Sequence, residues 1–411
     1  MIGRCSQRGW QIGIATILCT LYLVHASDAP PRKQVRYLMG TLCEIEAYGD
    51  EPNTDDAISA AFDELKRIDA SLSNWKADSE LMVLNRAAGA AGVQRQWVTA
   101  SPELFQRIQV ALHLAQATDG LFDPTVGPLV RAYGFLPAPS RSSGGQSIAE
   151  ARARVGWEKV KLNADSRTVQ FAIPGMEIDL GGIAKGYAAG RAAQIMREHG
   201  IISGLVSLGG SSLTAIGTPP GRGAWHLIIR DPRDGSRPAA FVELQDGESL
   251  STSGTYRNVK GEGKDWRSHI IDPRTGQPIR GRASVTVLTP NAEVSDALTK
   301  PFFFAGGGIP ARWVKWLAGF ENTSVILLRD QGSGLERITA GAHPERFERS
   351  ITTGDGNAAK ANRRSAQHLA RDGEGSTGHP PCAPQARGAE TNCAAGYDSA
   401  HISRDPGASL Y

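Results

Sequence analysis

Residues whose types and spacing could hold an anionic group lie in one stretch, Met176 to Gly200, with the sequence MEIDLGGIAKGYAAGRAAQIMREHG. Apolar and acidic residues alternate up to Leu180, as in a half-buried strand, and Gly181-Gly182 then permits a tight turn. From Ile183 the residues favour a helix, for which Gly200 is a suitable stop. Free N–H groups at the start of such a helix suit a phosphate, although GGxxKG is not a phosphate-loop spacing. A plain strand-to-helix connection is the commoner explanation of this stretch taken alone.

Four further residues could contribute to chemistry, and each also has a purely structural explanation. His269 could act as a base at neutral pH, or it could be a packed histidine beside two isoleucines. Asp296 could bind a hard cation, or it could be a first-turn helix acid favoured by the helix dipole. Lys185 could hold an anion or be a solvated helix cation, and Asp123 could face a ligand or form a turn before a proline. Residue type and spacing leave these alternatives open.

Helices and strands that could position these residues follow from periodicity and end signals. Residues 55–71 place Ile58, Phe62 and Leu65 on one helical face, and Ser101 starts a second helix that ends near residue 117. A third helix covers residues 291–306, where Pro301 ends or kinks it, and a short helix is expected over residues 310–320. The proline and glycine spacing of residues 121–135 is expected to exclude a regular element.

Several runs of alternating apolar residues, separated by turn residues, predict strands and hairpins between these helices. Asp272 opens one such turn and Gly276 permits positive φ within it. The pattern predicts the α+β class, with mostly antiparallel sheets, flanking helices and one catalytic domain over residues 33–348.

Length, charge and cysteine content narrow the classes of protein. The chain has 411 residues and a formal net charge of +3, which is too small to indicate a nucleic-acid partner. No CxxC pattern occurs, so neither a zinc ribbon nor a thioredoxin-type site is supported. From about residue 349 to 411 few large apolar residues remain, which predicts a disordered, low-complexity tail.

The first 26 residues have the pattern of a secretory signal peptide. Arg4 and Arg8 precede an apolar run from Ile12 to Val24, and Ala26 offers a cleavage site. The run is short for a bilayer span, so we expect cleavage and export, with an uncleaved N-terminal membrane anchor as the alternative.

Six stretches together match the pattern of one family in order, although each alone is loose. They are Met39-Gly40-Thr41, SNWKADSELMVLN (73–85), GLFDPTVGPL (120–129), IDLGGIAKGYAA (178–189), HIIDPRTGQPI (269–279) and SDALTK (295–300). Over about residues 36–344 the chain resembles the ApbE family of FAD:protein FMN transferases, also described as thiamine-biosynthesis lipoproteins. The resemblance implies an ApbE-like, T-fold-like catalytic domain.

The resemblance also implies a periplasmic flavoprotein enzyme that depends on Mg²⁺. Such an enzyme binds FAD, breaks its pyrophosphate and transfers FMN to a Thr or Ser hydroxyl of a redox protein, with AMP as the leaving group. The expected acceptor belongs to a membrane or periplasmic electron-transfer system. Two alternatives use the same site: an FAD pyrophosphatase that releases FMN and AMP, and a non-catalytic periplasmic FAD-binding protein.

Family roles carry over to this chain residue by residue, and the motif context then favours the chemical explanation of each residue. His269 falls on the proposed general base, Asp296 on a metal-binding catalytic position, and Gly182 on a metal position through its carbonyl oxygen. A hard cation held by such oxygens would neutralise charge on the phosphates, and a Thr hydroxyl would need a base within reach. The flavin-nucleotide positions are Met39, Trp75, Leu121, Phe122, Asp123, Asp179, Lys185 and Ile270.

One departure from the family pattern concerns the metal. After the metal-binding Asp the family has Ala-Leu-x-Thr, with the Thr hydroxyl on the metal, whereas this chain has Lys300 at the Thr position and Thr299 one residue earlier. Lys300 could point away while Thr299 or water completes the site, or its ammonium group could pair with Asp296 and replace the cation. We expect weakened or absent Mg²⁺ dependence. Gly182, where some relatives have Thr or Ala, is a second departure that a carbonyl ligand tolerates.

Overall fold

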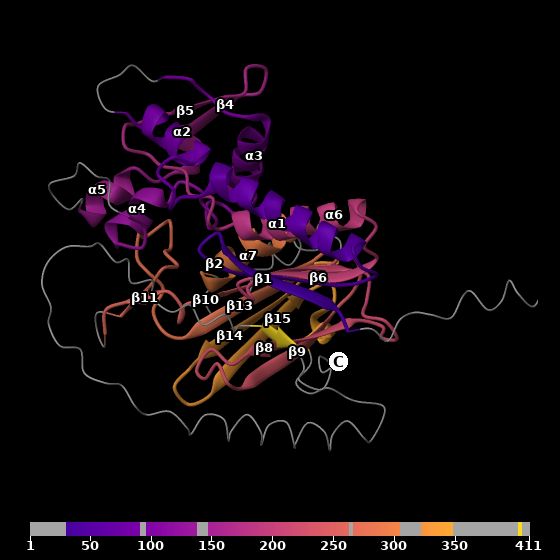
Figure 1. Cartoon of the computed structure of the whole chain (residues 1–411). Helices are drawn as coiled ribbons and strands as arrows, with labels where there is room; N and C mark the ends of the chain where they lie inside the picture. The colour runs from indigo at the N-terminus through magenta and orange to yellow at the C-terminus, as the bar shows by residue number, and fades with distance from the viewer. Residues whose placement is uncertain are drawn as a thin grey trace, which may run out of the picture.

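A central antiparallel sheet organises the molecule, which a computed structural model describes over residues 30–90, 96–137, 147–262, 266–304, 322–347 and 402–404 (Figure 1). Eight strands pair in the order β1-β2-β6-β7-β10-β13-β14-β15, and every pairing is antiparallel. These strands are β1 Arg32–Leu38, β2 Thr41–Tyr48, β6 Ser203–Leu208, β7 Ser212–Ile216, β10 Ser249–Gly254, β13 Ala283–Thr289, β14 Ser324–Asp330 and β15 Leu335–Gly341. The predicted α+β class with mostly antiparallel pairing is confirmed.

Three helices cover one face of this sheet: α1 (Asn53–Leu72), α6 (Ala184–Glu198) and α7 (Ala292–Phe303). The apolar face predicted for α1 is buried in the largest core cluster, together with the small-residue face of α6. Pro301 lies in the last turn of α7, where it cannot donate to the carbonyl four residues earlier, and α7 ends two residues later. The helix expected over residues 310–320 lies outside the described residues.

A smaller sheet packs on the opposite face, formed by β8 (Trp225–Arg230) and β9 (Pro238–Leu244). Alternation along β6 separates the two cores, because Leu205 joins this second core whereas Val206 joins the helix-covered one. The three-residue strand β16 (Ile402–Arg404), from the segment predicted to be a disordered tail, pairs with β8, and the prediction for the rest of that segment lies outside the described residues. The backbone groups of β8 on that side supply the hydrogen-bond partners for β16.

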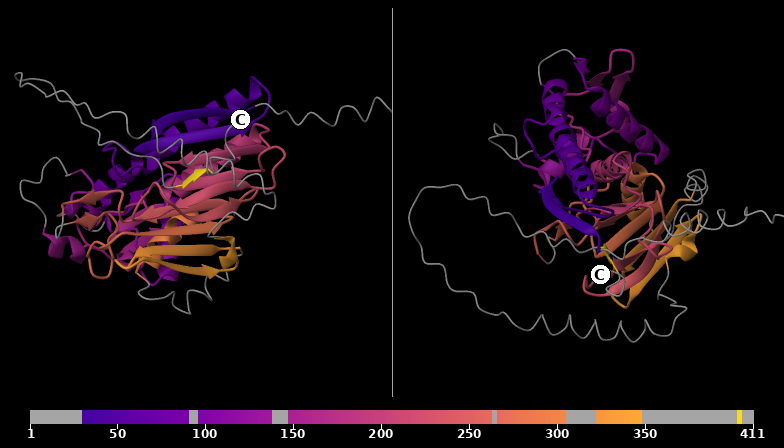
Figure 2. Two further views of the ribbon diagram at one scale, coloured as in Figure 1. Left: turned by 90° about the horizontal axis from the view of Figure 1, so that it is seen from below. Right: turned by 45° about the vertical axis from the view of Figure 1, so that its right-hand side comes forward.

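A second group of elements lies at one end of the sheet, beside the start of α6 (Figures 1 and 2). This group contains α2 Glu80–Ala88, α3 Pro102–Ala117, α4 Gly127–Ala132, α5 Ile148–Ala153, η1 Trp157–Lys159, β3 Val98–Thr99, β4 Val160–Asn163 and β5 Thr168–Phe171. Three short elements lie outside the group: β11 Val259–Lys260, β12 Arg267–Ser268 and η3 Pro344–Arg346. The Ser101 cap of α3 is confirmed, since its hydroxyl accepts the N–H of Leu104. The expectation that residues 121–135 exclude a regular element was wrong, because helix α4 lies within them. Pro128 lies in the first turn of α4, where a helix tolerates proline.

The prediction of a strand before Gly181-Gly182 was also wrong, because residues 176–180 are extended but pair with no strand of a sheet. Its backbone is paired instead with two asparagine side chains. Asn85 accepts the N–H of Ile178 at 2.8 Å and donates to its carbonyl at 2.8 Å, while Asn74 accepts the N–H of Leu180 at 3.3 Å. Side-chain amides thus replace a neighbouring strand, and the alternating burial that suggested a strand is kept.

Candidate active site

The turn after this extended segment is shaped by the side chain of Asp179 and by the ring of Phe122. The Asp179 carboxylate accepts the N–H of Gly181 at 2.7 Å, and its own N–H donates to the Pro124 carbonyl at 2.7 Å. Burial raises the pKa of Asp179. A Cβ at Gly182 would lie 2.9 Å from the Phe122 ring, so the close approach of that ring requires glycine here.

Helix α6 begins directly after the turn and lies against α7. A Cβ at Gly186 would collide with the Ala292 carbonyl, so glycine lets the two helices approach closely. The N–H of Gly186 donates to Asp296 Oδ2 at 3.1 Å. Lys185, on the first turn, has no hydrogen-bond partner for its ammonium group among the described residues. The predicted anion-binding start of α6 therefore already binds the Asp296 carboxylate, and it carries the Lys185 ammonium group beside it.

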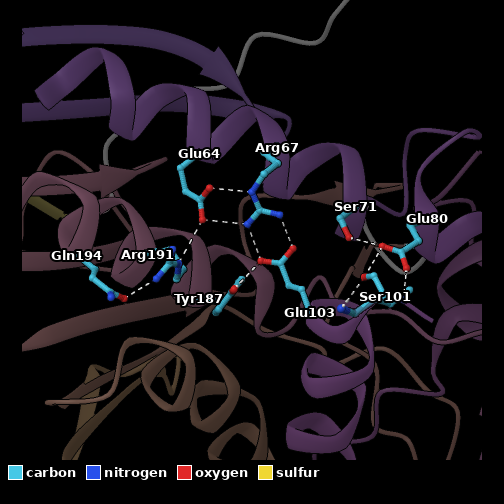
Figure 3. A network of polar contacts seen from close by, with 10 residues as sticks. Glu64, Arg67, Ser71, Glu80, Ser101, Glu103, Tyr187, Arg191 and Gln194 are labelled. Carbon is cyan, nitrogen blue, oxygen red and sulfur yellow. Dashed lines mark hydrogen bonds and ion pairs between the residues drawn. The ribbon is translucent and has the colours of Figure 1, made fainter. Parts of the chain in front are cut away.

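A polar network fixes the direction of α6 relative to α1 and α3 (Figure 3). Arg67 of α1 donates to both oxygens of Glu103 of α3 at 2.7 Å, and it also binds Glu64 on its own helix. Tyr187 and Arg191 of α6 complete the network by donating to Glu103 at 2.6 Å and to Glu64 at 3.2 Å. These bonds span three helices, so they hold the first turn of α6 and its Lys185 in place.

Lys300 of α7 lies where the family pattern expects a metal ligand. Its Nζ donates to the Gly182 carbonyl at 2.9 Å, to the Asp296 carbonyl at 2.8 Å and to Asp296 Oδ1 at 2.6 Å. Three acceptor oxygens match the three N–H groups of an ammonium ion, whereas a neutral amine has two. Thr299 does not face this group, because its hydroxyl lies 2.7 Å from that of Ser253 and donates to the Asp296 carbonyl at 2.6 Å.

The residues present do not fit a divalent metal at the predicted position. The Gly182 carbonyl and both carboxylate oxygens of Asp296 already accept hydrogen bonds from donors of the chain. Among the described residues, no group of three or more His, Cys, Asp or Glu side chains could hold a metal ion. A metal at these oxygens would lie against the Lys300 ammonium, which Coulomb repulsion disfavours.

His269 follows β12 and is half-buried beside the Lys185 and Lys300 charges. Its Nδ1 lies 3.2 Å from the Asn258 carbonyl, an acceptor, so Nδ1 carries the proton and Nε2 has the lone pair. Nε2 has no hydrogen-bond partner among the described residues. The ring edge packs on Phe135, with centroids 6.4 Å apart. His269 is therefore oriented as a proton acceptor at Nε2.

Burial and neighbouring charges shift the pKa values of three titratable groups at this site. Burial, with the nearby Lys185 and Lys300 charges, lowers the pKa of His269 to about 4, so the imidazole is neutral at physiological pH. Burial opposes ionisation of Asp296, but Lys300 and Lys185 outweigh it and hold its pKa below the usual value. Burial and Lys185 lower the pKa of Lys300, against the attraction of Asp296.

The remaining predicted flavin residues surround this cluster in different ways. Trp75 is 58% exposed on the loop that Asn74 ties to the extended segment, so its ring is available as a platform for a flat group. Met39 adopts positive φ (53°) in the turn between β1 and β2 and packs half-buried on the largest core. Leu121 and Ile270 are buried together in the core beneath α7.

Asp123 is committed to its own turn. One carboxylate oxygen accepts the N–H and the hydroxyl of Thr125 at 2.8 and 2.6 Å, and the other accepts the N–H of Trp157 at 3.2 Å. The structure thus gives Asp123 the turn-forming role, and its predicted flavin contact stays a prediction. The turn of Asp272 and Gly276, in contrast, forms as expected, with Gly276 at φ 69°.

Asn74 and Asn85 are the positioning residues that sequence reasoning missed. Both lie within the matched stretch of residues 73–85, so the stretch was recognised but the two side chains were not singled out. Their partners are about a hundred positions away in the chain, with separations of 93 for Asn85–Ile178 and 106 for Asn74–Leu180. An asparagine within an apolar helical pattern is the one local signal that could have drawn attention to Asn85.

Comparison with known proteins gives consistent matches. The ApbE family model matches residues 39–327. A Klebsiella pneumoniae protein named FAD:protein FMN transferase is 35% identical over 264 residues, covering 63% of this chain and 74% of that protein. A protein of the same name from Treponema pallidum is 32% identical, covering 72% and 85%.

Two solved structures share the fold. The ApbE protein from Thermotoga maritima superposes with a TM-score of 0.65 at 29% identity, covering 78% of this chain and 100% of that one. The flavin transferase ApbE from Vibrio cholerae gives 0.64 at 26% identity, covering 77% and 100%. Because the family model spans most of the described domain and the fold agrees, the chain belongs to the ApbE family.

Proposed function

We propose that this chain transfers FMN from FAD to a Thr or Ser hydroxyl of an acceptor protein and releases AMP. The names of its relatives favour this reaction. The observation that carries the proposal is the neutral His269, whose Nε2 is free to accept a proton beside two lysine charges and a helix N-terminus. A base next to a phosphate-binding surface is what hydroxyl attack on a pyrophosphate requires.

The proposed reaction has one displacement step. The acceptor hydroxyl oxygen bonds to the phosphorus of the FMN half, and the bond from that phosphorus to the bridging oxygen breaks. His269 Nε2 takes the hydroxyl proton, and AMP leaves with the bridging oxygen and the electron pair. His269 later returns the proton to solvent. Lys185, on the first turn of α6, stabilises the charge that develops on the phosphate oxygens.

Substrate binding in this proposal uses groups that face away from the core. The exposed ring of Trp75 would stack on a flat ring of FAD, while Asn85 and Asn74 keep the extended segment and its glycine turn in register with α6. In this proposal the residues of the chain bind and orient FAD and accept the proton, and none of these steps uses a metal ion.

A cellular assay can test the proposal before the acceptor is known. Envelope proteins from the source strain, from a strain lacking the gene and from complemented strains are run on a denaturing gel and examined for flavin fluorescence. We expect a covalently fluorescent band that disappears on deletion and returns with the wild-type gene. When the purified protein is mixed with envelope proteins of the deletion strain as the source of acceptor, AMP release from FAD without acceptor labelling would indicate a pyrophosphatase, and FAD binding without AMP release would indicate a binding protein.

We also propose that the protein is exported to the periplasm and that its acceptor belongs to a membrane or periplasmic electron-transfer system. Arg4, Arg8 and the apolar run that follows support export, although residues 1–26 lie outside the described structure. Within the described residues, no helix has the length and apolar character of a membrane span. Cell fractionation, with mass spectrometry of the mature N-terminus, tests export; a cytoplasmic protein that keeps Met1 would contradict it.

A further inference from the structure

The ammonium group of Lys300 is itself the cation that the oxygens of this site hold. Its ammonium group is held by three oxygens that come from two separate elements: the glycine turn before α6 and the middle of α7. The side chain is 21% exposed and that of Asp296 only 4%, so the pair is shielded from water but not sealed. Shielding strengthens the attraction between the two charges relative to a surface pair.

Every oxygen of Asp296 already accepts a hydrogen bond from a donor of the chain. Oδ1 accepts from Lys300, Oδ2 accepts from the Gly186 N–H, and the Asp296 carbonyl accepts from both Lys300 and Thr299. Thr299 is fully buried and its hydroxyl also contacts Ser253, so it cannot replace the missing hydroxyl ligand without repacking. A metal would have to displace Lys300 and leave a buried ammonium without its partners, which is costly.

We propose that Lys300 serves as a built-in cation that takes the place of the divalent metal in this chain, and that the reaction at this site is independent of Mg²⁺. The inference rests on the proposed function for its catalytic part only. Lys300 joins the Gly182 turn to Asp296, and its positive charge, like that of Lys185, is close enough to His269 to lower the pKa of that imidazole. Lys300 is thus a positioning residue for the turn and an electrostatic group for the phosphates.

Metal binding is tested directly, without reference to activity. Chelator-treated protein is titrated with Mn²⁺, a paramagnetic probe for a Mg²⁺ site, with and without FAD, and free Mn²⁺ is followed by electron paramagnetic resonance. We expect no saturable binding by the wild type. The variant Lys300→Thr, which places the family's residue at this position, should bind Mn²⁺ at least about tenfold more tightly. Lys161→Thr, a change at an exposed lysine of β4, should behave as the wild type.

Activity gives the second measurement. AMP release from FAD by chelator-treated wild type should change less than about twofold when Mg²⁺ is added, whereas Lys300→Thr should become Mg²⁺-dependent. Saturable Mn²⁺ binding by the wild type, or AMP release that vanishes in chelator and returns only with Mg²⁺, would overturn the proposal. So would a Lys300→Thr protein with a native circular dichroism spectrum but no gain in Mn²⁺ binding. Envelope proteins from the deletion strain are included in this assay as the source of acceptor. If the wild type then releases no AMP under any condition, the proposed function fails, and the Mn²⁺ titration still decides the cation site.

Discussion

Replacing Asn85 with alanine should loosen the extended segment that carries the glycine turn. Asn85 is 2% exposed and makes both a donor and an acceptor bond to the backbone of Ile178. The Ile178 N–H would lose its acceptor inside the core, which costs about 1–3 kcal/mol. The Ile178 carbonyl would keep its second donor, Asn74 at 3.2 Å, so its loss is nearer about 1 kcal/mol.

The sum predicts that Asn85→Ala lowers the free energy of unfolding by about 3 kcal/mol. Denaturant unfolding followed by circular dichroism measures this change at a constant m-value. Asn85→Asp keeps an acceptor for the N–H of Ile178 and should recover part of the loss. Val83→Ala on the exposed side of the same helix is the matched control and should change stability by less than about 0.5 kcal/mol. An Asn85→Ala protein within that range of the wild type would refute the view that asparagine side chains hold this segment.

Three further predictions concern charge. The pKa of His269 is lowered to about 4, and only the neutral imidazole accepts a proton. The value of kcat/KM for AMP release should therefore decrease at pH values below about 4 and stay constant from there toward neutrality. A pH–rate profile with its acid limb near about pH 6.5, the ordinary histidine value, would contradict this. Lys185→Ala should weaken FAD binding about tenfold to a hundredfold, measured by flavin fluorescence, because a charge-assisted contact to phosphate is lost; unchanged affinity would remove Lys185 from the site. Hydrogen bonds from Arg67 lower the pKa of Glu103, so their stabilisation is present above the unfolded-state pKa of Glu103 and is lost as pH falls through its lower folded-state pKa; Tm measured against pH should therefore fall less steeply on the acid side for Glu103→Gln.

The parts of the fold that sequence could predict are those where local pattern and tertiary packing agree. The apolar face of α1 and the Ser101 cap of α3 are local features, and both form as predicted. The extended segment before α6 was misjudged because alternating burial does not say what pairs with the backbone. Its partners, Asn74 and Asn85, are distant in the chain and are side chains instead of a strand. The sequence around Pro128 was taken to exclude a helix, because proline disrupts a helix interior; in the first turn, where Pro128 lies, proline is tolerated.

The candidate site was predictable as a set of positions but not as a set of contacts. The matched stretches named His269, Asp296 and Lys300, and the lysine at a threonine position already raised the question of the metal. Only the structure shows that the ammonium group reaches the Gly182 carbonyl as well as Asp296. Likewise, the tautomer of His269 depends on the Asn258 carbonyl, a backbone atom that residue type cannot indicate.

The central claim is that His269 is the base for covalent FMN transfer. The most direct test complements the deletion strain with wild type and with His269→Ala, and measures flavin fluorescence of the acceptor band on a denaturing gel at matched protein levels. We predict that the wild type restores the band and that His269→Ala labels the acceptor about 10²- to 10⁴-fold more slowly, with FAD binding retained. Full labelling by His269→Ala, or a band that persists when the gene is deleted, would contradict the account.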